Sequence, residues 1–387
     1  MERSFFFQLV TRLVPAATAA LAVVMLLPPD AVAVEGTSTP PMLKGDFRVG
    51  YQGGIGLIGL EDRSGGDDYF LDVGRFTEIE QGMRLEGSFA AYHGIAVRVG
   101  LPLTFYSARH WESANDFIFD PVSGGPSMVG GQALESSVLD ASGSSRTHAG
   151  PGEFEIGFRV VPFAQVGVPG RVAPASLAID FDVAAPSGGN HDTVREDETA
   201  GPGRGGPEVR LRMTGSRRFG NVEPYVAIGF IHRAAYRVDL EGARAVPSSD
   251  SDEEGLTELK PADEFSLRFG GEMIAVEDVD ADTGVRFLMG VGMTYVGPNE
   301  VSSGTLLPAP LAATVGHRAR SAEHLEIDLT MGLRARTKAD GEFFFDFGTT
   351  WLSPHSLELV SENAYGVRTA GPSFRLHWSL GATVRFR

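Results

Sequence analysis

Two side chains near the end of the sequence have the types that nucleophilic catalysis needs. His377 and Ser379 are separated by one residue. A serine hydroxyl becomes an effective nucleophile when a base such as histidine lies within hydrogen-bonding distance. Residues two apart in an extended strand lie on the same face, so this spacing permits the contact. The same pair also fits two polar residues that line a wet surface, and the surrounding strand decides between these interpretations.

That strand is a long alternating one. Residues 374–387 alternate strictly between apolar side chains, from Phe374 to Phe386, and polar or small ones, among them His377 and Ser379. This is longer than most strands of soluble proteins. It fits a membrane barrel, whose strands turn apolar side chains to lipid and polar ones to the lumen. We therefore expect His377 to line a lumen and expect no enzyme activity, with a long half-buried strand of a soluble sandwich as the alternative.

One acidic motif has the spacing of a calcium loop. Asp278, Asp280 and Asp282 alternate like the first ligands of such a loop. The loop requires glycine at its sixth position and glutamate at its twelfth. Here Gly284 is seventh and Met289 is twelfth. We interpret the segment as a solvated turn and predict no metal site.

Two further motifs are interpreted as loops. Residues 201–206 match the pattern Gly-x-Gly-x-x-Gly, but Pro207 and a strand pattern follow. A dinucleotide-binding motif requires a helix at that point, so we expect no cofactor. An acidic cluster between Asp250 and Glu258 could hold divalent cations at a surface. A soluble charged loop is the interpretation we favour.

The largest group of candidate functional residues consists of charged side chains. They occupy the polar positions of strands in which apolar and polar residues alternate. Asp180 and Asp182 are expected beside Arg210 and Arg212 on the next strand. Such charges can pair across strands and close a narrow barrel, or they can set the field of a pore that selects solutes. Both interpretations stay open. The residues predicted to line the lumen are Arg98, Glu153, Glu155, Arg159, Asp180, Asp182, Arg210, Arg212, Arg268, Glu272, Arg286, Glu326, Asp328, Arg334, Asp346, Arg375, His377 and Arg385.

These residues must be positioned by about twelve strands. Short turns and long connections alternate between them, as in bacterial outer-membrane barrels with an even strand number. The first and last strands must pair, because an open sheet edge cannot sit in lipid. The predicted fold class is therefore all-β, a transmembrane antiparallel up-and-down β-barrel. The expected strands cover residues 47–57, 83–91, 95–106, 153–160, 177–184, 208–214, 225–230, 267–273, 285–295, 325–334, 343–351 and 374–386.

The long connections are expected on one rim, outside the cell. They include the acidic loops Glu61–Glu80 and Glu241–Glu264 and the Gly- and Ser-rich segment Ser107–Pro151. The last segment holds the apolar Phe117 and Phe119, and exposed apolar side chains gain free energy by burial. We expect part of it to fold into the barrel mouth, so that Phe117 and Phe119 form a constriction. A surface loop that packs only on its neighbours is an equal alternative.

The N-terminus has the pattern of an export signal. Arg12 precedes a mostly apolar run over residues 13–27, and residues 31–33 read Ala-Val-Ala. This predicts a secretory signal peptide, with an uncleaved anchor as the alternative. The 387 residues include no Cys and carry a net charge of −17. These values exclude a disulfide framework and argue against a nucleic-acid partner. The expected organisation is a signal peptide over 1–33, a flexible periplasmic lead-in over 34–45 and the barrel over 46–387.

Four segments resemble a known family. They are IAVRVGLPL (95–103), GEFEIGFR (152–159), LAIDFDVAAPSGG (177–189) and VAIGF (226–230). In this order they resemble the outer-membrane transporters grouped with the meta-pathway phenol-degradation proteins. The resemblance implies passage of small, often hydrophobic compounds across the outer membrane. The family has no catalytic residues to carry over.

The expected function follows from these patterns. We expect a porin-like channel or passive transporter in a Gram-negative outer membrane, with outer-membrane lipids and the barrel-assembly machinery as partners and a small solute as cargo. A barrel with a sealed lumen that displays its loops is the first alternative. A lipid-active barrel enzyme is the second, because His377 and Ser379 are similar to the His-x-Ser pair of outer-membrane phospholipases. That enzyme would need this pair on the lipid face.

Overall fold

The structure is a computed structural model, and it describes fifteen stretches of the chain. In this part of the chain every regular element is a β-strand. No helix among these residues is long and apolar enough to cross a membrane. The described residues are 45–62, 71–92, 94–113, 128–129, 132–133, 143–144, 147–163, 175–187, 199–200, 206–239, 256–278, 283–302, 318–338, 341–360 and 365–386.

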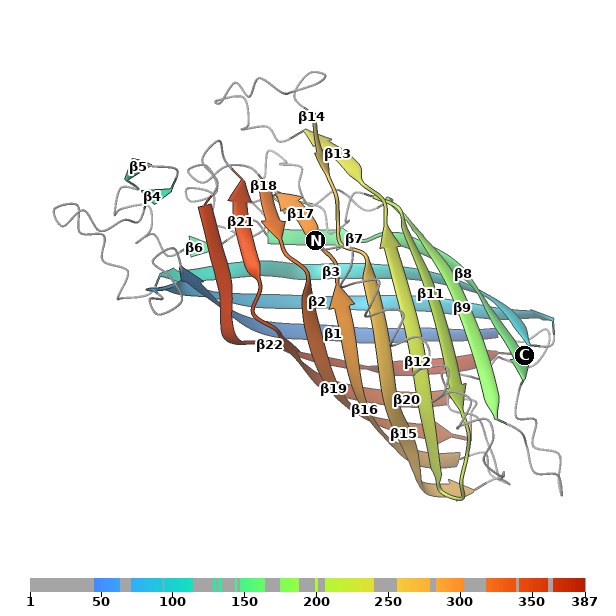
Figure 1. Ribbon diagram of the computed structural model, residues 1–387. Coiled ribbons are helices and arrows are strands. Elements are labelled where there is room, and N and C mark those ends of the chain that lie inside the picture. The colour runs from blue at the N-terminus through green and yellow to red at the C-terminus, as the bar shows by residue number, and fades with distance from the viewer. Residues whose placement is uncertain are drawn as a thin grey trace.

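Twelve long strands form a closed antiparallel barrel (Figure 1). The last strand pairs with the first, with Gly45 opposite Phe386 and Gly53 opposite Trp378. The predicted all-β fold, strand number and closure are therefore confirmed. In order around the barrel the strands are β1 (Gly45–Asp62), β2 (Leu71–Tyr92), β3 (Ile95–Ser113), β8 (Phe154–Phe163), β9 (Ser176–Ala185), β11 (Glu208–Ser216), β12 (Val222–Arg233), β15 (Glu264–Asp278), β16 (Thr283–Val296), β19 (His324–Thr337), β20 (Gly341–Leu352) and β22 (Tyr365–Phe386).

The connections differ between the two rims. At one rim the connections are short, except that between β8 and β9, which covers residues 164–175. In two of the short turns, Gly94 (φ 72°) and Gly220 (φ 60°) take the left-handed backbone conformation that glycine tolerates best. The other rim carries the long connections, and β13, β14, β17, β18 and β21 gather there in Figure 1. The short strands are β4 (Met128–Val129), β5 (Gln132–Ala133), β6 (Gly143–Ser144), β7 (Thr147–Pro151), β10 (Thr199–Ala200), β13 (Tyr236–Asp239), β14 (Leu256–Leu259), β17 (Asn299–Ser302), β18 (Arg318–Ser321) and β21 (Ser356–Val360).

The predicted long loops are wrong in their bounds. The predicted Ser107–Pro151 loop overlaps β3, which continues to Ser113, and contains β7, and the predicted Glu241–Glu264 loop contains β14 and the first residue of β15. The segment Glu61–Glu80 was expected to be an acidic loop, but β1 continues to Asp62 and β2 begins at Leu71. Glu78 lies opposite Gly56 in the β1–β2 ladder. A carboxylate can occupy this strand position because Nε of Arg375 lies 2.8 Å from Oε2 of Glu78. Residues 1–44 lie outside the described residues, so the signal peptide and the lead-in stay predictions.

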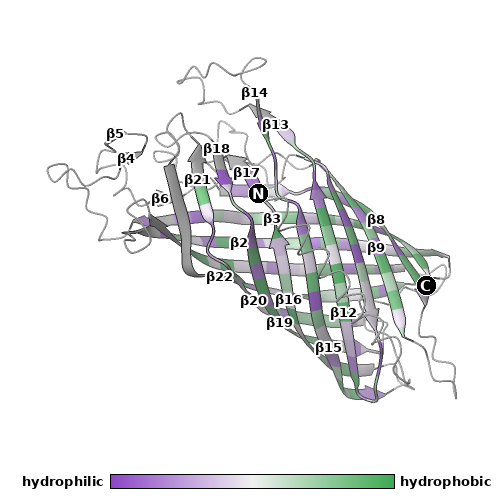
Figure 2. Cartoon of the chain, in the orientation of Figure 1, coloured by the Kyte–Doolittle hydropathy of each residue, from purple (hydrophilic) through white to green (hydrophobic). Residues whose placement is uncertain are grey.

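Side chains alternate between the two faces of the barrel wall. Figure 2 shows hydrophobic and hydrophilic residues following one another along the strands. In β19, Ile327 and Met331 are exposed on the outside, whereas Asp328 and Arg334 are buried inside. Exposed apolar side chains around the outside form the surface that a membrane barrel presents to lipid. The wall therefore has an apolar exterior and a polar interior.

Candidate functional site

The barrel interior holds a cavity of about 770 Å³. Ten carboxylates and nine arginine side chains belong to its lining. The lining is thus close to neutral, although the whole chain carries a charge of −17. Local pairing between these groups, rather than one dominant sign of charge, therefore determines what the cavity can bind.

Most of the lumen residues singled out in the sequence come together around this cavity. Three of them are absent from its lining. Glu153 is buried immediately before β8, Nη1 of Arg286 lies 3.4 Å from Oε2 of Glu272, and Arg375 contacts Glu78. The others line it: Arg98, Glu155, Arg159, Asp180, Asp182, Arg210, Arg212, Arg268, Glu272, Glu326, Asp328, Arg334, Asp346, His377 and Arg385.

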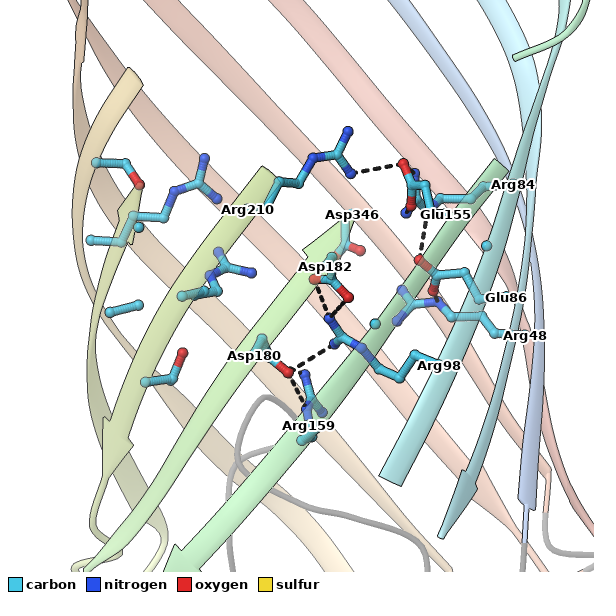
Figure 3. A pocket seen from close by; sticks show the side chains of 18 of the residues that line it. Arg48, Arg84, Glu86, Arg98, Glu155, Arg159, Asp180, Asp182, Arg210 and Asp346 are labelled. Carbon is cyan, nitrogen blue, oxygen red and sulfur yellow. Dashed lines mark hydrogen bonds and ion pairs between the residues drawn. The ribbon is translucent and has the colours of Figure 1, made fainter. Parts of the chain in front are cut away.

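The first ion-pair cluster joins β3, β8 and β9 (Figure 3). Nη2 of Arg98 lies 2.6 Å from Oδ1 of Asp182, and Nη1 of Arg98 lies 3.0 Å from Oδ1 of Asp180. Nε of Arg159 donates to Oδ1 of Asp180 at 2.7 Å. Register places both aspartates opposite arginines of β11, as predicted. Among the described residues, however, their ion pairs go to β3 and β8 instead.

The second cluster runs from β2 to β12. Glu155 of β8 accepts hydrogen bonds from Arg84 of β2 and, at 2.7 Å, from Nη1 of Arg210 of β11. Arg210 also bonds to Glu208. Glu208 in turn accepts from Nε of Arg233 at 2.7 Å. Glu155 and Glu208 each contact two arginines, so ion pairs cross-link this side of the lumen.

The opposite side of the lumen is held in a different way. Nη1 of Arg334 donates to Oδ1 of Asp346 at 2.7 Å. The guanidinium carbon of Arg48 lies 3.9 Å from the centre of the Phe344 ring, a cation–π contact. Phe344 turns inward because Gly50 and Gly381 leave room for its ring. A large apolar side chain is thereby accommodated inside the barrel, covered by an arginine.

The His377 and Ser379 pair does not form a catalytic dyad. His377 lines the cavity, and the hydroxyl of Ser379 donates to Oδ2 of Asp346 at 3.3 Å. No hydrogen bond joins the two among the residues that the structure describes. Both belong to the lumen-facing set of β22, and neither lies on the lipid face that a lipid-active enzyme would use.

Some of the residues singled out in the sequence cannot be placed in the structure. Phe117 and Phe119 lie outside the described residues, as do Asp280 and Asp282. Within the described stretches, no group of three or more His, Asp or Glu side chains is arranged to hold a metal ion. The predicted constriction therefore stays a prediction.

Several residues line the cavity that are not among those predicted from the sequence. Arg48, Arg84 and Glu86 belong to the lining, and each stands at a polar position of an alternating segment. The signal that identified the other charges would have identified these as well. Tyr225 also lines the cavity. A tyrosine is harder to assign, because the aromatic side chains of barrels also gather at the membrane interfaces.

Comparison with known proteins agrees with this architecture. No protein family and no curated protein matches the sequence. The crystal structure of the COG4313 outer membrane channel from Pseudomonas putida F1 matches with a TM-score of 0.50 and 14% identity, covering 92% of this chain and 100% of that one. A Pseudomonas aeruginosa FadL homologue matches with a TM-score of 0.38 and 11% identity over 88% of this chain and 90% of that one. The outer membrane protease OmpT from Escherichia coli matches with a TM-score of 0.33 and 10% identity over 90% of this chain and 100% of that one. The first of these likenesses shows the fold: the protein has the architecture of outer-membrane β-barrels.

Proposed function

We propose that the protein is a passive channel for small molecules in a bacterial outer membrane. The observation that carries this proposal is the cavity of about 770 Å³ inside a closed barrel with an apolar exterior. This volume falls within the roughly 300–1,000 Å³ typical of sites for small organic ligands. The outer-membrane lipids and the barrel-assembly machinery are the partners that such a protein requires.

The lining favours solutes that carry polar groups. Inward-facing side chains around the cavity are mostly charged, polar or small. The resemblance to transporters of hydrophobic compounds adds an apolar body to the expected cargo, and a constriction by Phe117 and Phe119 would fit it. We therefore propose small organic molecules, rather than ions alone, as the solutes.

A sealed, structural barrel is the second candidate. The arginine–carboxylate clusters that join β2, β3, β8, β9 and β11 favour it, because they cross-link one side of the lumen. Swelling of liposomes that contain the purified barrel distinguishes the two. A channel admits neutral sugars up to a size limit, whereas a sealed barrel gives the same response as liposomes without protein.

A further inference from the structure

One arginine in the lumen stands apart from the ion-pair clusters. Arg212 of β11 is exposed to the cavity. No carboxylate lies within 4.0 Å of it among the described residues. Arg210, two residues earlier on the same face, contacts both Glu155 and Glu208. Two neighbouring positions on one strand therefore carry the same side chain, one neutralised and one not.

A second arginine nearby is only weakly held. Nη2 of Arg268 of β15 lies 3.7 Å from Oδ1 of Asp328, and the Arg268 side chain is 42% exposed. This distance exceeds the range of a hydrogen bond. Arg212 and Arg268 both line the cavity. Two like charges therefore face the same region, and an anion between them would relieve their repulsion.

Strand β12 runs between these two arginines. Gly229 of β12 is the register partner of Arg212, and Ala227 is the register partner of Arg268. Ala227 is buried, and the hydroxyl oxygen of Ser266 would lie 2.5 Å from a Cβ added at Gly229. Both arginines and both small residues line the cavity. Arg212 is exposed and the Arg268 side chain is 42% exposed, so a solute in the lumen can reach both guanidinium groups.

Tyr225 completes the arrangement. Its ring lies against Gly270 and Gly290, where an added Cβ would come within 2.6 Å and 2.5 Å of its atoms. Its hydroxyl has no hydrogen-bond partner among the described residues. The cavity lining beside β12 thus includes two guanidinium groups, one hydroxyl and one aromatic ring. Donors and an apolar surface occur side by side.

We infer that Arg212, Arg268 and Tyr225 form a binding subsite for the carboxylate of a small organic acid. Guanidinium groups bind carboxylates through charge-assisted hydrogen bonds. The Tyr225 ring offers the organic body an apolar surface that an inorganic anion would not use. This inference deepens the proposed function, because it names the class of solute that the lumen selects.

Titration of the full-length folded barrel in detergent with benzoate, observed by ligand NMR, tests the subsite. Wild type is expected to bind benzoate and to ignore benzamide, which has the same shape without the charge. Arg212→Gln and Arg268→Gln should each weaken benzoate binding about tenfold or more, the cost of one lost charge-assisted contact. Tyr225→Phe should weaken it by less.

Arg210→Gln is the matched control. It removes the same charge from the same strand face, while Glu155 and Glu208 keep Arg84 and Arg233 as partners. It should change benzoate affinity by less than about twofold, since its guanidinium is already neutralised. Folding of each variant is checked by its heat-modifiable migration on a gel. Should one glutamine variant not fold, the other and Tyr225→Phe still carry the test.

Three results would overturn the subsite. If Arg210→Gln and Arg212→Gln weaken benzoate binding equally, the positive charge of the lumen as a whole attracts benzoate and there is no specific site. Benzamide binding as tightly as benzoate would remove the role of the carboxylate, and phosphate binding more tightly than benzoate would remove the organic acid. Benzoate binding in a barrel that passes no solute would support the subsite and contradict the channel. Conduction without benzoate binding would contradict the subsite alone.

Discussion

Arg98 and Asp182 are joined across an intervening strand. Nη2 of Arg98 on β3 lies 2.6 Å and 2.5 Å from the two carboxylate oxygens of Asp182 on β9. Gly157 on β8 is the register partner of both residues. A Cβ at Gly157 would lie only 1.9 Å from Oδ1 of Asp182. Because Gly157 has no side chain, Arg98 on β3 can reach Asp182 on β9 across β8.

The same arrangement recurs around the barrel. Gly56 is the register partner of both Arg375 and Glu78, which are hydrogen-bonded at 2.8 Å. Gly292 stands in the same way between Arg268 and Asp328, where the separation is 3.7 Å. At these three positions an inward glycine lets charged residues of the two flanking strands contact each other. The longest of the three contacts is that between Arg268 and Asp328, at the proposed subsite.

Replacing Gly157 with Ala should destabilise the barrel. The added methyl group would displace the Asp182 carboxylate and separate it from Arg98. Loss of hydrogen bonds between charged groups should lower the free energy of unfolding by about 1–3 kcal/mol. Urea unfolding followed by tryptophan fluorescence measures the change.

Gly271→Ala serves as its control. An added Cβ at Gly271 would meet its nearest neighbours at 3.5 Å, an ordinary van der Waals distance. Its effect on the free energy of unfolding should be small. If both variants lose the same stability, the absence of a side chain at Gly157 has no special role.

The sequence predicted the facing of side chains but not their partners. Period-2 alternation assigns Asp182 to the lumen by itself, since neighbouring positions must face opposite sides. The contact of Asp182 with Arg98 depends on the register of three strands, and a slip of one residue would reverse every facing. Glu78 shows the same limit. The acidic residues around Glu78 favour a loop, and its partner, Arg375, lies 297 residues away in the sequence.

Leu329 and Thr330 test the facing directly. Leu329 lies between Val291 and Thr349 in the ladders, on the lipid side, whereas Thr330 lines the cavity. Leu329→Arg should cost roughly 2–4 kcal/mol in a bilayer. Thr330→Arg should cost far less, because it adds a charge to a wet lumen. Reversible unfolding in lipid vesicles measures both, and equal losses would contradict the facing.

His355 at the long-connection rim should titrate at an unusually low pH. Its ring stacks on His324 with centroids 3.9 Å apart. Burial and the neighbouring His324 lower the pKa of His355 from 6.5 to about 4. Between these values the folded state binds fewer protons than the unfolded state, so stability should fall as pH falls from 6.5 to 4.

NMR titration of the His355 ring measures this pKa. His324→Asn should raise this pKa, because the neighbouring imidazole that lowers it is removed while burial remains. His232→Asn, elsewhere on the rim, should leave it unchanged. A wild-type His355 that titrates near 6.5 would show that the stacked pair does not form.

The orientation in the membrane follows from the lengths of the connections. An epitope inserted near Ser251, between β12 and β15, should be labelled by antibody on intact cells. One inserted at Asp280, between β15 and β16, should be labelled only after the outer membrane is permeabilised. Both positions lie outside the described residues, in connections of opposite rims. Labelling of the Asp280 insertion alone would reverse the orientation.

Single-channel current across a planar bilayer tests the central claim, an open lumen that passes small solutes. The folded barrel should give discrete and reproducible conductance steps. Deletion of Asn115–Gly130, which lies outside the described residues except for Met128 and Val129 of β4, should enlarge the steps if this loop narrows the mouth. Inserted, heat-modifiable barrels that carry no current would contradict the channel and show that the arginine–carboxylate clusters seal the lumen.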